Sequence, residues 1–200
     1  MSEAEYWSDY YESRAKQIEP PSLFAQATAA HFKDSIRSVL EVGCGSGRDA
    51  YYLGTQYKVL ALDIANKPSD TDNCTFQQKS MEELTGEHDL LYSRFSLHSV
   101  SENTEESVLR YALAHCRYIA LEVRSVKDEV GQNKNEKNES RDATSYAAAH
   151  YRRFFDFEKT KQKMETMGFI LIVAEESNDF APYKGQRPYC IRIIARTSRD

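Results

Sequence analysis

Apolar residues occur along this chain in short runs that alternate with amphipathic stretches. Between residues 37 and 123 the runs have the β-branched and apolar content of buried strands, and the stretches between them have helical spacing. The predicted strands are residues 38–42, 58–63, 74–77, 88–95 and 118–123, and the predicted helices are 48–55, a short one beginning at 81–84, and 105–116. Such alternation predicts a parallel sheet with helices on both faces.

The two ends of the chain extend this pattern. Helical spacing in residues 1–35 is interrupted at Pro20 and Pro21, after which Ser22 is placed to cap a second helix. Near the C-terminus an amphipathic helix and two antiparallel strands are predicted, at 157–167, 169–174 and 191–195. We therefore expect a single α/β domain over residues 1–200, with a mostly parallel seven-stranded sheet and an antiparallel final strand.

Residues 128–145 break the alternation, because almost no apolar side chain occurs in the first part of this segment. We expect a mobile polar loop at the surface. Two interpretations stay open: a solvated insertion, or a lid over a binding site.

The composition is that of a globular protein without a strong charge bias. Of the 200 residues, 40% are hydrophobic and 28% are charged, and the net charge is -5. Since a basic excess is missing, we expect no nucleic-acid partner. No apolar run reaches the roughly 20 residues that span a bilayer, and the acidic N-terminus shows no signal peptide. Four cysteines without CxxC or zinc-ligand spacing predict reduced thiols, no metal site and a cytoplasmic protein.

The strongest chemical signal is a glycine-rich turn between a strand and a helix. Strand 38–42 is followed by Gly43, Gly45 and Gly47, which allow close approach of a ligand and positive φ angles. The helix after this turn presents free N–H groups. Asp63 ends the next strand, 20 residues after Gly43, where a carboxylate suits a ribose diol.

Two cofactor classes share this layout. Dinucleotide enzymes use G-x-G-x-x-G, whereas the third glycine comes one residue early here. Glu41 precedes the turn, and a carboxylate repels a pyrophosphate but attracts the ammonium group of a methionine moiety. The charges therefore favour S-adenosylmethionine, with a nicotinamide-dependent oxidoreductase as the rival interpretation.

Two sequence motifs carry a family resemblance. V-L-E-V-G-C-G-S-G-R-D resembles motif I of class I S-adenosylmethionine-dependent methyltransferases, and L-A-L-D-I resembles their motif II. This resemblance covers residues 37–123 and implies a Rossmann-like methyltransferase fold. Over most of the chain, segments such as L-Y-S-R-F-S-L-H and H-Y-R-R-F are similar to bacterial methyltransferases of surface-polysaccharide biosynthesis.

The resemblance implies a role for each cofactor-binding position. The implied contacts are Glu41, Gly43, Gly45 and Gly47 to the methionine part, Asp63 to the ribose, Ile64, Ser80 and Met81 to the adenine, and Ser93 beside the methyl group. Ser80 departs from the Asp that many relatives carry. Trp7, Tyr10 and Tyr11 are placed in an N-terminal helical lid over 1–35, where an aromatic face attracts a sulfonium. A packed aromatic stripe is the alternative interpretation.

The residues after the fourth and fifth strands indicate the acceptor. The Asn/Asp-Pro-Pro-Tyr motif of amino-group methyltransferases is replaced by Tyr-Ser-Arg-Phe at 92–95, which favours an oxygen nucleophile. Cations near the strand ends predict a site for a phosphate or carboxylate, formed by Arg94, Arg124, Lys127, Tyr151, Arg152, Arg153 and Lys184. Alternatively these are surface charges paired with Glu122, Glu175, Glu176 and Asp179.

A hydroxyl acceptor needs a general base, for which His98 and His150 are the candidates, whereas an anionic oxygen needs none. The sequence thus predicts an enzyme that transfers a methyl group to an oxygen of a small polar, anionic acceptor such as a sugar, a sugar phosphate or a glycan terminus. A non-catalytic partner protein with the same fold and a methyltransferase that acts on a macromolecule are the alternatives.

Overall fold

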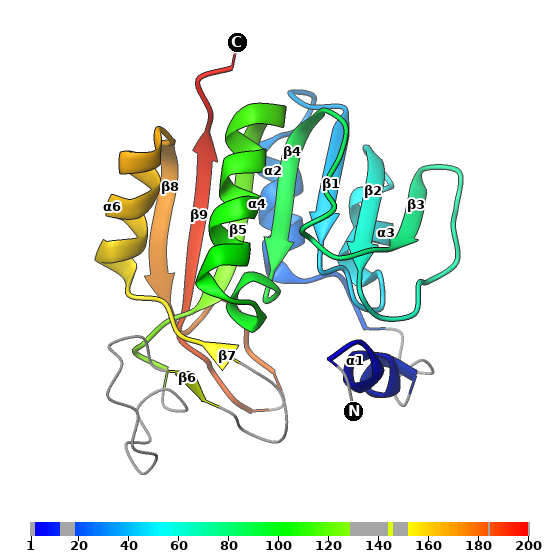
Figure 1. Cartoon of the computed structure of the whole chain (residues 1–200), viewed down its shortest axis with the longest axis horizontal. Coiled ribbons are helices and arrows are strands. Elements are labelled where there is room, and N and C mark those ends of the chain that lie inside the picture. The colour runs from blue at the N-terminus through cyan, green and yellow to red at the C-terminus, as the bar shows by residue number, and fades with distance from the viewer. Residues whose placement is uncertain (1–2, 13–18, 129–143, 146–151, 184, 200) are drawn as a thin grey trace.

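A seven-stranded sheet forms the centre of the molecule (Figure 1). The computed structural model describes residues 3–12, 19–128, 144–145, 152–183 and 185–199. In sheet order the strands are β3 (Cys74–Gln78), β2 (Lys58–Asp63), β1 (Ser38–Val42), β4 (His88–Arg94), β5 (Cys116–Arg124), β9 (Cys190–Arg196) and β8 (Ile170–Ser177).

The first five strands in this order are parallel to their neighbours, and β9 runs antiparallel to both β5 and β8. Strand β1 lies between β2 and β4, where Leu40 pairs with Leu60 on one side and Leu91 on the other. Four of its five residues are buried, which explains its almost continuous apolar sequence. The expected mostly parallel sheet with an antiparallel final strand is confirmed.

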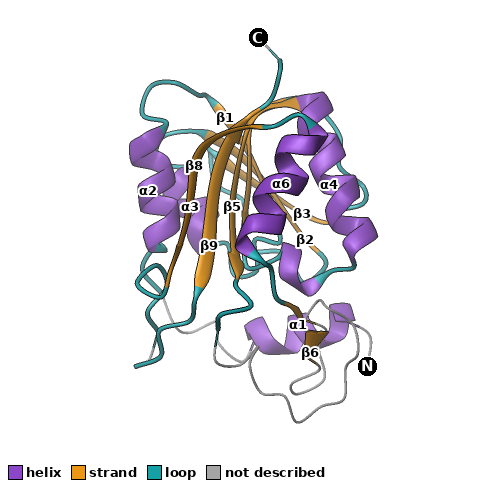
Figure 2. Cartoon of the chain, turned by 90° about the vertical axis from the view of Figure 1, so that its left-hand side faces the viewer, coloured by secondary structure: helices purple, strands orange, loops and turns teal. Residues whose placement is uncertain are grey.

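Helices cover both faces of the sheet (Figure 2). Helices α2 (Leu23–His31) and α3 (Arg48–Leu53) pack on one face, and α4 (Glu102–His115) and α6 (Phe157–Met167) on the other. Each pair buries its own apolar cluster, with Phe24 and Leu53 in the first and Leu109 and Met164 in the second. Burial of these side chains from both faces is the main stabilising term of the fold.

Short polar signals set where these helices begin and end. Ser22, Ser101 and Asp156 each accept a hydrogen bond from the backbone N–H three residues later, which caps α2, α4 and α6. Gly168 ends α6 in the left-handed conformation, with φ of 108°.

Two smaller elements lie at the end of the sheet toward which the parallel strands point (Figure 1). One is helix α1 (Glu3–Glu12), and the other is the antiparallel pair β6 (Thr144–Ser145) and β7 (Arg152–Arg153). A short 3₁₀ turn, η1 (Leu97–Ser99), comes after β4 at the same end.

Two expectations require correction or restriction. The short helix predicted from residue 81 is wrong, because Ser80 and Glu83 close a single turn: Ser80 N donates to Glu83 Oε2, and Glu82 N donates to Ser80 Oγ. Most of the predicted polar loop, 129–143, lies outside the described residues. At its ends, Asp128 lies in a bend as predicted but is buried instead of exposed, and 144–145 form a strand instead of a loop.

The described part of the chain shows neither a membrane-spanning helix nor a metal site. No helix there is both long and apolar enough to cross a membrane. Within the same residues, no cluster of histidine, cysteine or acidic side chains is arranged to hold a metal ion. All four cysteines are buried and carry free thiols.

One buried carboxylate joins three elements below the glycine turn. Asp49 in α3 accepts hydrogen bonds from Ser22 N at 2.8 Å, from Ser22 Oγ at 2.7 Å and from the Tyr92 hydroxyl of β4 at 2.9 Å. Because Asp49 is only 5% exposed, water does not replace these contacts.

Replacing this carboxylate should therefore destabilise the whole domain. We expect Asp49→Ala to lower the free energy of unfolding by roughly 2–4 kcal/mol, since three buried donors lose their acceptor. Urea denaturation followed by circular dichroism measures the change. The exposed Asp72→Ala serves as control and should stay within about 0.5 kcal/mol of the parent. Equal stability of the two variants would contradict the tethering role of Asp49.

Candidate functional site

A cavity of about 1280 Å³ opens at the carboxyl ends of β1, β2, β4 and β5. It lies across the junction of β1 and β4, where the strand order changes direction, which is the usual ligand site of open α/β sheets. Its volume exceeds the roughly 300–1,000 Å³ of a typical site for one small ligand. The cavity therefore has room for two reactants.

The glycine turn forms one wall of this cavity. Gly43 and Gly45 line it with φ of 73° and 52°, a region that favours glycine. A Cβ atom on Gly43 would lie 2.2 Å from the Cβ of Ser96, and one on Gly45 would lie 2.4 Å from the Tyr11 ring. Gly47, also at positive φ, is the N-cap of α3 and shapes the turn without lining the cavity.

Asp63 joins the end of β2 to this turn. Its carboxylate accepts a hydrogen bond from Gly45 N at 2.7 Å and another from Ala65 N at 2.9 Å, and its side chain lines the cavity. Burial raises the pKa of Asp63, while these backbone N–H groups oppose the rise. The carboxylate therefore fixes the turn and borders the cavity at once.

Glu41 lies deeper in the same wall. It is 3% exposed, and its Oε2 atom accepts no hydrogen bond from any described residue. Burial raises its pKa well above the usual range, and the charges of Asp49 and Asp63 raise it further. A buried carboxyl without a partner, on the wall of a cavity, fits a ligand that brings a positive charge or a hydrogen-bond donor. The donor set therefore fits S-adenosylmethionine, which carries both.

The predicted adenine contacts and the aromatic helix also line the cavity, namely Ile64, Ser80, Met81, Trp7, Tyr10 and Tyr11. Helix α1 is attached to the chain after β2: Asn66 N donates to Ser8 Oγ, and Asn66 Nδ2 donates to Glu12 Oε1. The Trp7 and Tyr11 rings stack at 6.0 Å, so the aromatic stripe is packed internally and also faces the cavity. Burial and the charge of Asp63 raise the pKa of Tyr11.

Ser93 does not face the cavity, contrary to the expectation from the sequence. It is completely buried, and its Oγ atom lies 2.6 Å from Ser96 Oγ, which donates to the Val42 carbonyl. Ser96 lines the cavity in its place, against Gly43. Sequence reasoning missed Ser96 because it lies after the end of β4, where the alternation of side chains along the strand no longer predicts which residue faces the site.

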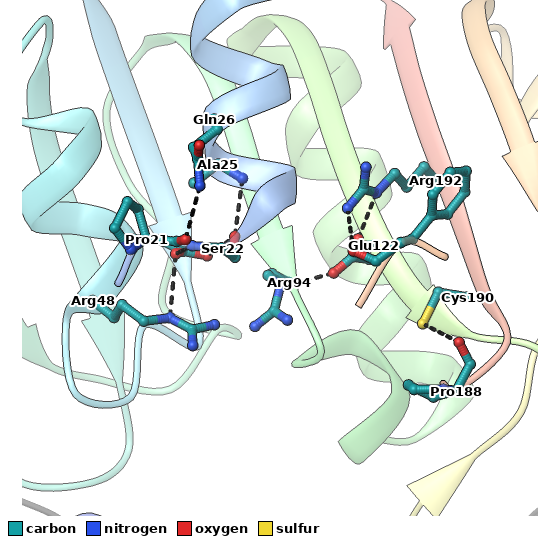
Figure 3. A network of polar contacts seen from close by, with 12 residues as sticks. Pro21, Ser22, Ala25, Gln26, Arg48, Arg94, Glu122, Pro188, Cys190 and Arg192 are labelled. Atoms are coloured by element: carbon teal, nitrogen blue, oxygen red, sulfur yellow. Dashed lines mark hydrogen bonds and ion pairs between the residues drawn. The ribbon is translucent and has the colours of Figure 1, made fainter. Parts of the chain in front are cut away.

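The opposite wall carries arginines. Arg94 and Arg124, at the ends of β4 and β5, and Arg152 of β7 line the cavity. Arg94 Nε donates to Glu122 Oε1 at 2.8 Å, and Arg192 Nε donates to Glu122 Oε2 at 2.5 Å (Figure 3). Glu122 is fully buried between the two, and Arg192 carried no signal in the sequence.

Arg124 and Arg152 lie close enough to influence each other. Arg124 Nη1 donates to Asp128 Oδ2 at 2.5 Å. Burial lowers the pKa of Arg152, and the charge of Arg124 lowers it further. The acidic side chains Glu41 and Asp63 thus border one cavity together with four arginines, Arg48, Arg94, Arg124 and Arg152. The charges of Arg48 and Arg94 oppose the rise of the Glu41 pKa, so these groups lie near one another.

Two of the predicted acceptor residues lie elsewhere. Arg153 forms a buried ion pair with Glu105 of α4 and does not line the cavity, because successive side chains of β7 point in opposite directions. Lys127 pairs with Glu176 at 2.5 Å and leaves its side chain largely exposed, as the surface-charge alternative predicts. His150, Tyr151 and Lys184 lie outside the described residues.

His98 and Phe95 also line the cavity. His98 of η1 is 3% exposed and lines the cavity, and its ring centre lies 5.5 Å from that of Phe95. Phe95 is a non-glycine residue with φ of 57°, and no pattern in the sequence predicted a role for it.

Comparison with known proteins bears on the fold. No protein-family model matches the sequence, and no curated protein matches it. Among solved structures, the chain is similar to 1,6-didemethyltoxoflavin-N1-methyltransferase of Burkholderia thailandensis, with 17% identity and a TM-score of 0.74 over 98% of this chain and 86% of that chain.

Two further solved structures are similar to this chain over most of its length. The glycopeptide N-methyltransferase MtfA has a TM-score of 0.63 and 15% identity, over 89% of this chain and 95% of that chain. The magnesium protoporphyrin IX methyltransferase ChlM of Synechocystis PCC 6803 has a TM-score of 0.64 and 12% identity, over 99% of this chain and 89% of that chain. The protein therefore has the fold of class I S-adenosylmethionine-dependent methyltransferases. The resemblance to enzymes of surface-polysaccharide biosynthesis gains no support from these structures and stays a prediction.

The buried carboxyl of Glu41 gives a testable dependence of stability on pH. Because its pKa is raised in the folded protein from the usual 4.5, its contribution to stability is complete at lower pH and is lost as pH rises through the raised value. Glu41→Gln stays uncharged at every pH. We expect this variant to match the parent near pH 4 and to exceed its free energy of unfolding by more than about 1 kcal/mol near pH 9.

Urea denaturation at each pH provides the measurement. The exposed Glu165→Gln of α6 is the matched control and should keep the pH profile of the parent. Parallel profiles for Glu41→Gln and the parent would contradict a raised pKa for Glu41.

Proposed function

We propose that this protein transfers the methyl group of S-adenosylmethionine to a small polar acceptor. The observation that carries the proposal is the wall formed by Glu41, the glycine turn and Asp63. It combines close backbone approach with a buried carboxyl whose Oε2 atom has no protein partner among the described residues. Several structures with this fold contain the methyl donor or its demethylated product, which supports the same assignment.

The donor, when bound, supplies an already activated methyl group, so the protein mainly has to hold and orient. Asp63 is placed to accept hydrogen bonds from the ribose hydroxyls while its present bonds keep Gly45 in position. Glu41 would receive the ammonium group, and the rings of α1, which line the cavity, would offer an aromatic face to the sulfonium. These residues exclude water from the path between donor and acceptor.

The same wall discriminates against the rival cofactor. Glu41 and Asp49 lie behind the glycine turn, where a dinucleotide enzyme would receive a pyrophosphate. Carboxylate charge at this place repels phosphates, whereas a bound cation favours the ionised form of Glu41 and is attracted by it. We therefore propose methyl transfer in preference to hydride transfer.

For the acceptor we propose an oxygen nucleophile on a small anionic molecule such as a sugar, a sugar phosphate or a glycan terminus. The support is the set of arginines Arg94, Arg124 and Arg152 on the cavity lining, which suits a negative group. Similar structures include N-methyltransferases, so the choice of oxygen rests on the residues of this chain. We place the reaction in the cytoplasm, since four buried free cysteines suit a reducing compartment.

Binding of the demethylated product, S-adenosylhomocysteine, tests the cofactor directly. Trp7 lines the cavity and is the single tryptophan of the chain, so its fluorescence should change on titration with this compound and stay constant with NADH. We expect Asp63→Asn to weaken the affinity about tenfold or more, because a charged acceptor for two hydroxyls is lost. Asp72→Asn, exposed between β2 and β3, should bind as the parent does. A response to NADH alone would contradict the proposal.

The acceptor atom and the base can be tested together. Carbon-13-labelled donor is incubated with the protein and a polar-metabolite extract, and the product methyl signal should be that of an O-methyl group.

His98 lines the cavity beside Phe95, and we propose it as the base for a hydroxyl acceptor. His98→Gln should then lower kcat about a hundredfold with little change in KM. A kcat within about twofold of the parent would exclude this role and indicate an acceptor oxygen that is already ionised.

A further inference from the structure

Phe95 occupies an unfavourable backbone conformation at the edge of the cavity. Its φ of 57° lies in the left-handed region, which bulky residues rarely adopt. The residue comes directly after β4, and its N–H donates to the Glu122 carbonyl at 2.9 Å. Strained residues of this kind persist where the surrounding structure requires their position, commonly at ligand sites.

The Phe95 side chain is a common support for two guanidinium groups. The Cζ atom of Arg94 lies 4.3 Å from the centre of its ring, and that of Arg124 lies 5.8 Å from it. An aromatic face attracts both cations and restricts their rotation. The strained backbone therefore places one ring where it can hold two arginines from neighbouring strands at the cavity wall.

Arg94 keeps donors that the described protein does not use. Its Nε atom is bound to Glu122, and no described residue accepts a hydrogen bond from either Nη atom. Figure 3 shows these two nitrogens turned away from Glu122. A guanidinium fixed at Nε presents its outer nitrogens as a planar fork, whose geometry matches two oxygens of one anion.

The charges around this fork leave room for an anion. Arg94 and Arg192 share the single carboxylate of Glu122, so these three side chains together carry one net positive charge. Nearby, burial and then the positive charge of Arg124 lower the pKa of Arg152, while Asp128, which pairs with Arg124, opposes this shift.

We infer that Arg94 and Arg124, supported by Phe95, form an oxyanion subsite that binds a phosphate or carboxylate group of the acceptor. This inference rests on the proposed function, because the acceptor is the one proposed there. Its test measures anion binding alone and needs no methyl transfer. The subsite and the acidic wall of Glu41 and Asp63 border the same cavity, and Arg94 lies near enough to Glu41 to oppose the rise of its pKa. Phe95 acts as a positioning residue, through the arginines that it holds.

The test uses the full chain saturated with S-adenosylhomocysteine and titrates it with inorganic phosphate by calorimetry, with acetate in a second arm. We expect phosphate or acetate to bind, and the stronger of the two identifies the acceptor group. Arg94→Lys keeps the charge but removes the fork, so it should weaken anion binding about tenfold or more while the affinity for S-adenosylhomocysteine stays within about twofold. The exposed Arg110→Lys of α4 is the matched control and should bind both ligands as the parent does.

A second variant distinguishes loss of the subsite from a structural effect of losing the contact between Arg94 and Glu122. Phe95→Gly keeps both arginines and gives the positive φ to a residue that tolerates it. We expect its melting temperature to stay within a few degrees of the parent while anion affinity falls about fivefold or more. Unchanged anion affinity in both variants would overturn the subsite.

The remaining outcomes separate the two proposals. Loss of S-adenosylhomocysteine binding in Arg94→Lys would show that this arginine serves the donor carboxylate instead, and would overturn the inference while leaving methyl transfer intact. If the parent binds no S-adenosylhomocysteine, the proposed function fails. The phosphate and acetate titrations of the ligand-free protein then still decide whether the oxyanion subsite exists.

Discussion

The position of the glycine turn depends on the carboxylate of Asp63. It accepts a hydrogen bond from the turn at Gly45 N and another from Ala65 N beyond its own strand, and so joins the ends of β1 and β2. The glycine turn that this link holds lines the cavity, and Glu41 lines it from within β1, where pairing with β2 and β4 fixes its place. A carboxylate is suited to this task because it accepts several hydrogen bonds and still offers oxygen lone pairs to a ligand.

The presence of both signs of charge on one cavity is the second organising feature of the site. The carboxyl groups of Glu41 and Asp63 and the guanidinium groups of Arg94 and Arg124 border the same space. Such a lining suits a cationic group and an anionic group at once. It also explains why an acidic chain can present a locally basic surface, since the net charge says nothing about where the charges lie.

Much of this architecture was predictable because local sequence and tertiary structure agree. Strand 58–63 and helix 157–167 have the predicted bounds, since each is apolar at the period of its own element and ends at a polar or glycine signal. The directions in which individual side chains point were harder to predict from the sequence. Arg152 and Arg153 are neighbours of the same type, and only their pairing with 144–145 decides that the first faces the cavity and the second faces Glu105. Arg192 stayed hidden because it lies within an apolar strand.

The antiparallel strand β9 affects the site through the side chain of Arg192. Arg192 reaches Glu122 from β9 because it lies directly opposite that residue in the register with β5. A slip of one residue would turn the Arg192 side chain to the other face of the sheet and leave a fully buried carboxylate with Arg94 alone. The register of the C-terminal strand therefore decides whether the carboxylate that holds Arg94 keeps its second cation.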